Sequence, residues 1–229
     1  MRTQGDPTMI EVPAGRVTLS DRRTERSWTV DVGPFALGTV PVTQGLYEQV
    51  MGDRPSTAHA DRLPVEGVSW DDAIRFCDAL SVREGLRPAY RVPADDTDTD
   101  VEAPDWDRTA DGYRLPTEAE WEHACRAGTT EARYGPLDEI AWHRGNSGER
   151  LHEAGGRRPN DWGLHDMLGN VWEWCWDVYD PEVYGSYRVL RGGGWFDDHW
   201  SCRASVRRRS HPTLRIDDVG FRLARTLPG

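Results

Sequence analysis

The sequence is poor in cysteine and has no long apolar run. Its cysteines, at positions 77, 125, 175 and 202, include no CxxC pair, so the ligand spacing of zinc ribbons and thioredoxin-like redox sites is absent. Residues 1–6 contain no apolar core of a signal peptide, and no segment reaches membrane-spanning length. We therefore expect reduced thiols, a cytoplasmic location and no membrane partner.

An excess of positive charge is also missing. Against 28 basic residues stand 39 acidic ones, which gives a net charge of −11. A surface of this sign repels phosphate backbones, so we expect no nucleic-acid partner. Basic residues are concentrated only in segment 203–215, where they are open to two interpretations: structural partners of nearby acids, or a local site for an anion or substrate. They are Arg203, Arg207, Arg208, Arg209 and Arg215.

Short apolar runs separated by turn residues fill residues 8–40 and predict a β-meander. Three helices are predicted after it, each with a Ser or Thr N-cap and a glycine at its end, over residues 43–52, 69–85 and 117–128. Cys77 falls on the apolar face of the second helix, so we interpret it as a small buried side chain rather than a nucleophile.

The chain contains no Pro-rich or Ser/Gly-rich linker, so we predict one domain over residues 1–229 with a core at about 8–225. Its 23 Gly and 15 Pro favour many turns and few long elements. The predicted class is α+β, irregular, with short antiparallel strands. Residues 94–111 hold eight acids but lack the Gly and Glu of an EF-hand loop, and are predicted to form a solvated loop between two strands.

Many segments resemble hallmarks of the sulfatase-modifying factor family, whose founding member is the formylglycine-generating enzyme. In the family's order they lie at 41–43, 64–70, 114–128, 145–148, 159–164, 166–174, 188–193 and 219–222. The resemblance implies a C-type-lectin-like core with little regular secondary structure. The family includes formylglycine-generating enzymes, iron-dependent sulfoxide synthases and hypervariable ligand-binding proteins, so the fold does not determine the function.

The resemblance implies a structural calcium site. The family uses an Asn or Asp side chain, two backbone carbonyls and a Glu, and these positions are Asp166, Gly169, Val171 and Glu173. Oxygen ligands of this kind suit a hard cation, so we expect calcium as a structural cofactor. The alternative is that the two carboxylates only accept hydrogen bonds from local amides.

The resemblance fails at the residues of the family's copper chemistry. The generating enzyme uses two cysteines five positions apart, which suit a soft monovalent copper ion. Here these positions are Asp197 and Cys202, the family's serine is Gly194, and its asparagine is Asp218. Trp172 remains as a wall of the pocket. We therefore expect no formylglycine formation by the two-thiolate route.

Three functions remain open. The first is a divergent oxygen-dependent oxidoreductase that acts on a small molecule or peptide, with Cys202 and Asp197 as catalytic residues and copper, iron or no transition metal. His199 and Cys202 are close enough in sequence to share an ion, although one such pair is a weak metal signature, and the His-x3-His-x-Glu pattern of the sulfoxide synthases is absent. The second is a non-catalytic ligand- or protein-binding domain, such as a variable receptor. The third is a structural or partner subunit of a complex.

The binding hypothesis depends on aromatic and charged residues gathered on one segment. Such residues are typical of recognition surfaces, although Trp195 also suits packing against the glycine turn before it. Hypervariable members of the family vary this same loop. The predicted substrate-binding residues are Trp172, Trp195, His199, Trp200, Arg203 and Asp218.

Overall fold

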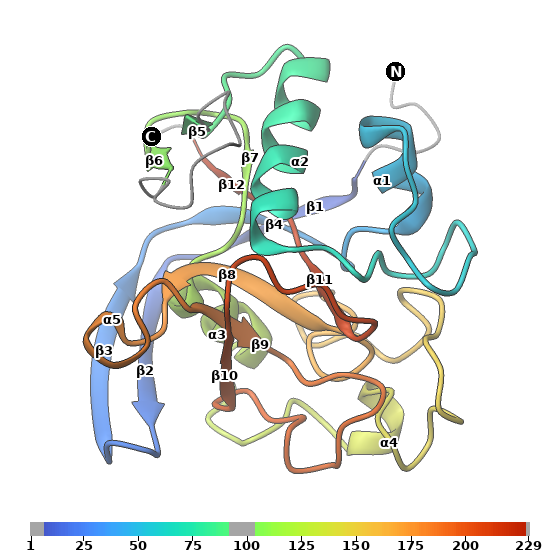
Figure 1. Cartoon of the computed structure of the whole chain (residues 1–229). Helices are drawn as coiled ribbons and strands as arrows, with labels where there is room; N and C mark the ends of the chain where they lie inside the picture. Colours follow the sequence, from blue (N-terminus) through green and yellow to red (C-terminus); the bar gives the residue numbers. More distant parts are fainter. Residues whose placement is uncertain (1–6, 92–103, 228–229) are drawn as a thin grey trace.

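The computed structural model describes residues 7–91 and 104–227 (Figure 1). Residues 94–103 of the predicted acidic loop therefore lie outside the described residues. On either side of them, strands β5 (Tyr90–Arg91) and β6 (Asp105–Trp106) pair antiparallel. Within the described ranges, no helix is both long and apolar enough to cross a bilayer.

The first sheet joins the two ends of the chain. Its strands lie in the order β1 (Met9–Val12), β4 (Phe35–Gly38), β12 (Ala224–Thr226) and β7 (Tyr113–Arg114), and each neighbouring pair is antiparallel. All four residues of β4 are buried, because this strand lies between β1 and β12. The centre of this sheet is thus made from residues almost two hundred positions apart.

The predicted meander over residues 8–40 is correct in its strands and wrong in their pairing. Between β1 and β4 the chain forms a separate two-stranded ribbon of β2 (Gly15–Asp21) and β3 (Arg26–Val32), which extends away from the first sheet (Figure 1). Alternation of apolar and polar residues identifies strands but not their partners, and β4 buries more of its surface between β1 and β12 than it would beside the largely exposed β3.

The second sheet carries the Trp-rich segment. Its order is β10 (Arg207–Ser210), β9 (Arg188–Arg191), β8 (Trp172–Val178) and β11 (Val219–Phe221). The pair of β8 and β11 is parallel, unlike the predicted antiparallel pattern, and sets Trp172 opposite Val219. Two segments that the sequence separates by more than 40 residues are thereby neighbours.

The three predicted helices are confirmed as α1 (Gln44–Met51), α2 (Trp70–Arg83) and α3 (Glu118–Arg126). The side chains of Thr43, Ser69 and Thr117 accept hydrogen bonds from the first turn of each helix, and the last two form complete capping boxes. The structure adds two single-turn helices, α4 (Leu137–Ile140) and α5 (Pro181–Tyr184).

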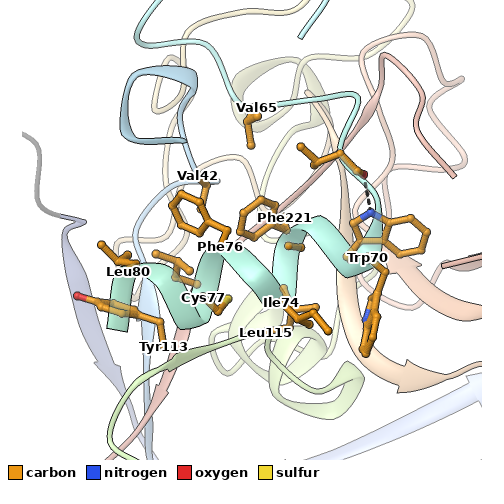
Figure 2. Packing of buried hydrophobic residues seen from close by; sticks show 14 of the residues in the cluster. Val42, Val65, Trp70, Ile74, Phe76, Cys77, Leu80, Tyr113, Leu115 and Phe221 are labelled. Atoms are coloured by element: carbon orange, nitrogen blue, oxygen red, sulfur yellow. Dashed lines mark hydrogen bonds between the residues drawn. The ribbon is translucent and has the colours of Figure 1, made fainter. Parts of the chain in front are cut away.

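Helix α2 packs into an aromatic core (Figure 2). Phe76 stacks on Tyr47 with ring centroids 5.3 Å apart and meets Phe221 edge-on at the same distance. Cys77 is fully buried on this helix, as predicted, and burial raises the pKa of its thiol well above the ordinary value. A Cys77 thiolate is therefore disfavoured.

All 28 basic residues of the chain are arginines, and several hold buried carboxylates. Arg191 is 1% exposed and donates to Glu118 and Glu122 on α3. Arg222 is fully buried, and its guanidinium donates to both carboxylate oxygens of Glu173 at 2.8 and 3.0 Å. The planar guanidinium suits such two-point contacts.

Candidate functional site

A cavity of about 140 Å³ lies where the second sheet meets the C-terminal loops. Trp172 comes from β8, Arg208 from β10, and Asp218 immediately precedes β11. Leu214 and Ile216, from the connection between β10 and β11, complete its apolar wall. The backbone N–H of Trp172 donates to the carbonyl of Asp218 at 2.7 Å, so the parallel strand pair fixes the two residues side by side.

Asp197 positions the indole of Trp172. Its Oδ2 accepts hydrogen bonds from Trp172 Nε1 at 2.6 Å and from the backbone N–H of Gly194 at 3.0 Å, while Oδ1 accepts from Ser201 Oγ at 3.1 Å. These three donors, one from β8 and two from the loop of Asp197, hold the carboxylate in place. The structure thus gives Asp197, which was predicted to be catalytic, the contacts of a positioning residue.

Cys202 lies in the hydrophobic core and not on the cavity wall. It is fully buried among apolar residues, and its Sγ would lie 3.0 Å from a Cβ added at Gly193. Burial, reinforced by the negative charge of Asp197, raises the pKa of the thiol to about 12. The thiol is therefore neutral and shielded near pH 7, and these surroundings do not support the predicted catalytic role.

Gly194 and Asp218 are adjacent in space. A Cβ at position 194 would lie 3.1 Å from Asp218 Oδ2 and 3.3 Å from Trp172 Cδ1, which is closer than ordinary contact. Glycine at the family's serine position therefore makes room for the Asp218 carboxylate. Burial, followed by the negative charge of Asp197, raises the pKa of Asp218 to about 6, and Arg208 opposes this shift.

Large apolar side chains are exposed on the loop that contains Asp197 and on the connection between β10 and β11. Phe196, Trp200 and Ile216, which we call the aromatic rim, are 49%, 53% and 43% exposed. Half of the exposed large apolar side chains of the described residues thus fall within 21 positions of the sequence. Trp195 is more constrained, because its Nε1 donates to the carbonyl of Asp217 at 3.1 Å. Solvent-exposed apolar groups in one place favour an interaction surface.

Two further predicted residues lie near the cavity but do not line it. His199 is exposed, and its carbonyl accepts a hydrogen bond from Arg133 at 2.5 Å. Arg203 is partly buried on the same loop. Within residues 7–91 and 104–227, no three His, Cys, Asp or Glu side chains are placed to hold an ion together. The His199–Cys202 pair therefore gains no third side-chain ligand.

The residues expected to bind calcium lie at a second place, in the turn before β8. Asp166 is 1% exposed and has a φ of 52°; its Oδ2 accepts from the backbone N–H of Gly155 at 2.6 Å. Its Oδ1 is buried and has no hydrogen-bond partner in the described part of the chain. A buried carboxylate oxygen without a donor fits a cation ligand.

The carboxylate of Glu173 already accepts hydrogen bonds from neighbouring side chains. Three N–H groups, two from Arg222 and one from Trp121, donate to its carboxylate. A carboxylate offers about four lone-pair sites, so about one remains for an ion. The unpartnered oxygen of Asp166 therefore fits a cation better than the carboxylate of Glu173 does.

Arg208 and Ile216 were not among the predicted site residues. Residues 207–210 show no apolar alternation that would predict a strand, but the side chains of the observed strand alternate between its two faces. Arg207 and Arg209 point to one face of β10, where Arg207 pairs with Glu118 at 2.7 Å. Arg208 must then point to the opposite face, toward Trp172. Ile216 carries no local signal either.

A family model, described as the sulfatase-modifying factor enzyme 1-like domain, matches residues 1–227. The chaperone protein LppX of Paenibacillus barcinonensis is 36% identical to the chain, over 86% of this chain and 82% of LppX. The hercynine oxygenase of Mycobacterium tuberculosis is 33% identical over 85% of this chain, which spans 53% of the length of that relative.

The solved structure of Treponema denticola variable protein 1 has a similar fold. It superposes with a TM-score of 0.84 and 34% identity, over 95% of this chain and 94% of that protein. The likeness thus covers both sheets and the loops around the cavity.

Proposed function

Because the chain belongs to the sulfatase-modifying factor family and has its C-type-lectin-like fold, we propose that it binds a polypeptide partner at the aromatic rim and the cavity beside it. The family hosts more than one function, so the proposal depends on the site itself. The observation that carries it is the exposure of Phe196, Trp200 and Ile216. Ile216 lines the Trp172 cavity, and the other two lie on the loop whose Asp197 accepts a hydrogen bond from Trp172 Nε1.

The size of the cavity favours a side chain over a whole small molecule. Pockets for drug-sized ligands have about 300–1,000 Å³, whereas this cavity has about 140 Å³. A partner that places one side chain in the cavity and lays its surface on the rim fits both features. Aromatic residues next to arginine, as Phe196 is next to Arg144 at 5.0 Å, are typical of binding hot spots.

Two similarities support a binding function. LppX, which matches the chain over most of both lengths, is named a chaperone protein. The Treponema structure is named a variable protein. Neither name describes an enzyme, and the burial of Cys202 is in keeping with a site that does not use a thiolate.

Truncating the rim should weaken binding of a peptide selected from a displayed random library on the wild-type protein. We expect Trp200→Ala to raise the Kd about 10-fold to 100-fold, because a central aromatic residue contributes about 2 kcal/mol or more when it is a hot spot. Titration calorimetry measures the change. Val183→Ala is the matched control, since Val183 is 57% exposed and lies on α5, outside the rim. Equal Kd values for the two variants, or no selectable peptide, would contradict the proposal.

A second candidate is an oxygen-dependent oxidoreductase acting on a small molecule or peptide. The similarity to hercynine oxygenase over 85% of the chain favours it. This candidate requires stoichiometric iron or copper in the purified protein together with oxygen uptake in the presence of a thiol peptide or hercynine. If both are observed, and if the rim variants leave them unchanged, the oxidoreductase replaces the binding protein as the function.

We further propose that calcium binds at Asp166 and at the carbonyls of Gly169 and Val171. Adding a chelator such as EGTA should lower the melting temperature, because an ion that binds only the folded state stabilises it by about 2.7 kcal/mol at 100 times its Kd. Differential scanning calorimetry with and without calcium measures this shift. Asp166→Asn should remove most of the calcium response, whereas Asp161→Asn, an exposed neighbour, should keep it. Unchanged melting of the wild type in chelator rules out the site.

A further inference from the structure

The guanidinium of Arg208 lies at the mouth of the cavity. Its Cζ lies 5.4 Å from the centroid of the Trp172 ring, and its Nη1 lies 3.8 Å from Asp197 Oδ1. The side chain is nevertheless 58% exposed. An ion pair of this length with an exposed arginine is weak, so moving Arg208 aside costs little.

Asp218 supplies an unused acceptor in the same cavity. No other described residue donates a hydrogen bond to its carboxylate, although the group is largely buried beside Trp172 and Gly194. Both oxygens of Asp197 already accept hydrogen bonds, so Asp218 is the carboxylate that remains available to a ligand. A largely buried carboxylate that accepts a hydrogen bond only from its own backbone N–H is stabilised by a nearby cation.

We propose that the cavity receives the guanidinium of an arginine side chain from the partner polypeptide, which displaces Arg208 from Trp172 and pairs with Asp218. This inference rests on the proposed binding function and names the group that enters the cavity. The aromatic wall and the carboxylate provide the two contacts that a guanidinium makes best, stacking and paired hydrogen bonds.

The volume of the cavity and the net charge of the protein agree with an arginine side chain as the ligand. A volume of about 140 Å³ lies below the range of about 300–1,000 Å³ for drug-sized ligands and suits the end of one side chain. The net charge of −11 attracts basic partners over longer distances. The position of Arg208 shows that a guanidinium is accommodated at the mouth of the cavity.

The probe for this inference is N-acetyl-arginine amide, with N-acetyl-citrulline amide as its neutral isostere. Titration followed by NMR of the Trp172 indole resonance should show saturable binding of the arginine probe alone. We expect Asp218→Asn to raise the Kd at least 10-fold and Arg208→Ala to lower it several-fold. Asp198→Asn, which removes the same charge from an exposed position on the loop between β9 and β10, should change the Kd less than twofold.

Three results would overturn the inference: equal binding of citrulline and arginine probes, an unchanged Kd in Asp218→Asn, or an unchanged Kd in Arg208→Ala. Circular dichroism of each variant separates loss of the site from loss of the fold. If selected peptides bind through Trp200 but do not respond to Asp218→Asn, the cation site fails and the polypeptide-binding function stands. If the arginine probe binds and Trp200→Ala leaves peptide affinity unchanged, the cation site stands and the polypeptide-binding function of the rim fails.

Discussion

Replacing Arg222 with Met should lower the free energy of unfolding by about 3–5 kcal/mol, the range for removing one partner of a buried ion pair. Glu173 is 1% exposed, and among the described residues Arg222 is its only cationic partner. After the substitution the carboxylate keeps only the N–H of Trp121, at 2.7 Å. The carbonyls of Gly38 and His165 also lose donors.

Urea denaturation measures this loss. Arg16→Met is the matched control, because Arg16 and Asp31 form an ion pair in which both side chains are more than two-thirds exposed, and it should leave the stability nearly unchanged. Adding Glu173→Gln to Arg222→Met should restore part of the stability, since the uncompensated charge is then gone. A loss below about 1 kcal/mol in Arg222→Met would show that water or another group satisfies Glu173.

Gly220→Ala should destabilise the protein by about 1–3 kcal/mol or more. It should also lower the affinity for the N-acetyl-arginine amide probe. A Cβ at position 220 would lie 2.3 Å from the backbone carbonyl oxygen of Val65, and a backbone atom cannot rotate away as a side chain does. Strand β11 would therefore move away from the loop that contains Val65. Asp218 and Val219 line the cavity and directly precede Gly220, so the site would move with the strand.

Gly33→Ala provides the control for the effect of an added methyl group. No described atom lies within 4 Å of its Cβ position, and its φ is not in the left-handed region. Its stability should be unchanged or higher by about 0.4–1 kcal/mol, because alanine reduces the freedom of the unfolded chain. If calorimetry shows equal melting temperatures for Gly220→Ala and Gly33→Ala, β11 is not packed tightly against Val65.

Local signals in the sequence were sufficient for the helices. Thr43, Ser69 and Thr117 mark N-caps by their own side chains, so neighbouring residues alone predict where each helix begins. Strand pairing follows different rules. The partners of β4 and β8 lie far along the chain, and apolar alternation carries no information about which distant strand will be adjacent.

The candidate site was predicted in part. Trp172 and Asp218 follow from the family's motifs, and the structure places them side by side. The burial of Cys202 could not be predicted, because it depends on how Gly193 and the surrounding loops pack over the thiol. Arg208 reaches the cavity only because β10 is a strand, and four residues containing three consecutive arginines give no apolar alternation by which to recognise one.

The central place of β12 in the first sheet has a consequence for how the protein is made. Strand β4 is synthesised early, yet one of its two neighbours is formed by residues 224–226. At a translation rate of about 5–20 residues per second, β4 waits about 10–40 s with one edge unpaired. A nascent chain whose β12 has not yet emerged from the ribosome therefore exposes a strand edge, and chaperones that shield such edges should contact it until β12 pairs with β4.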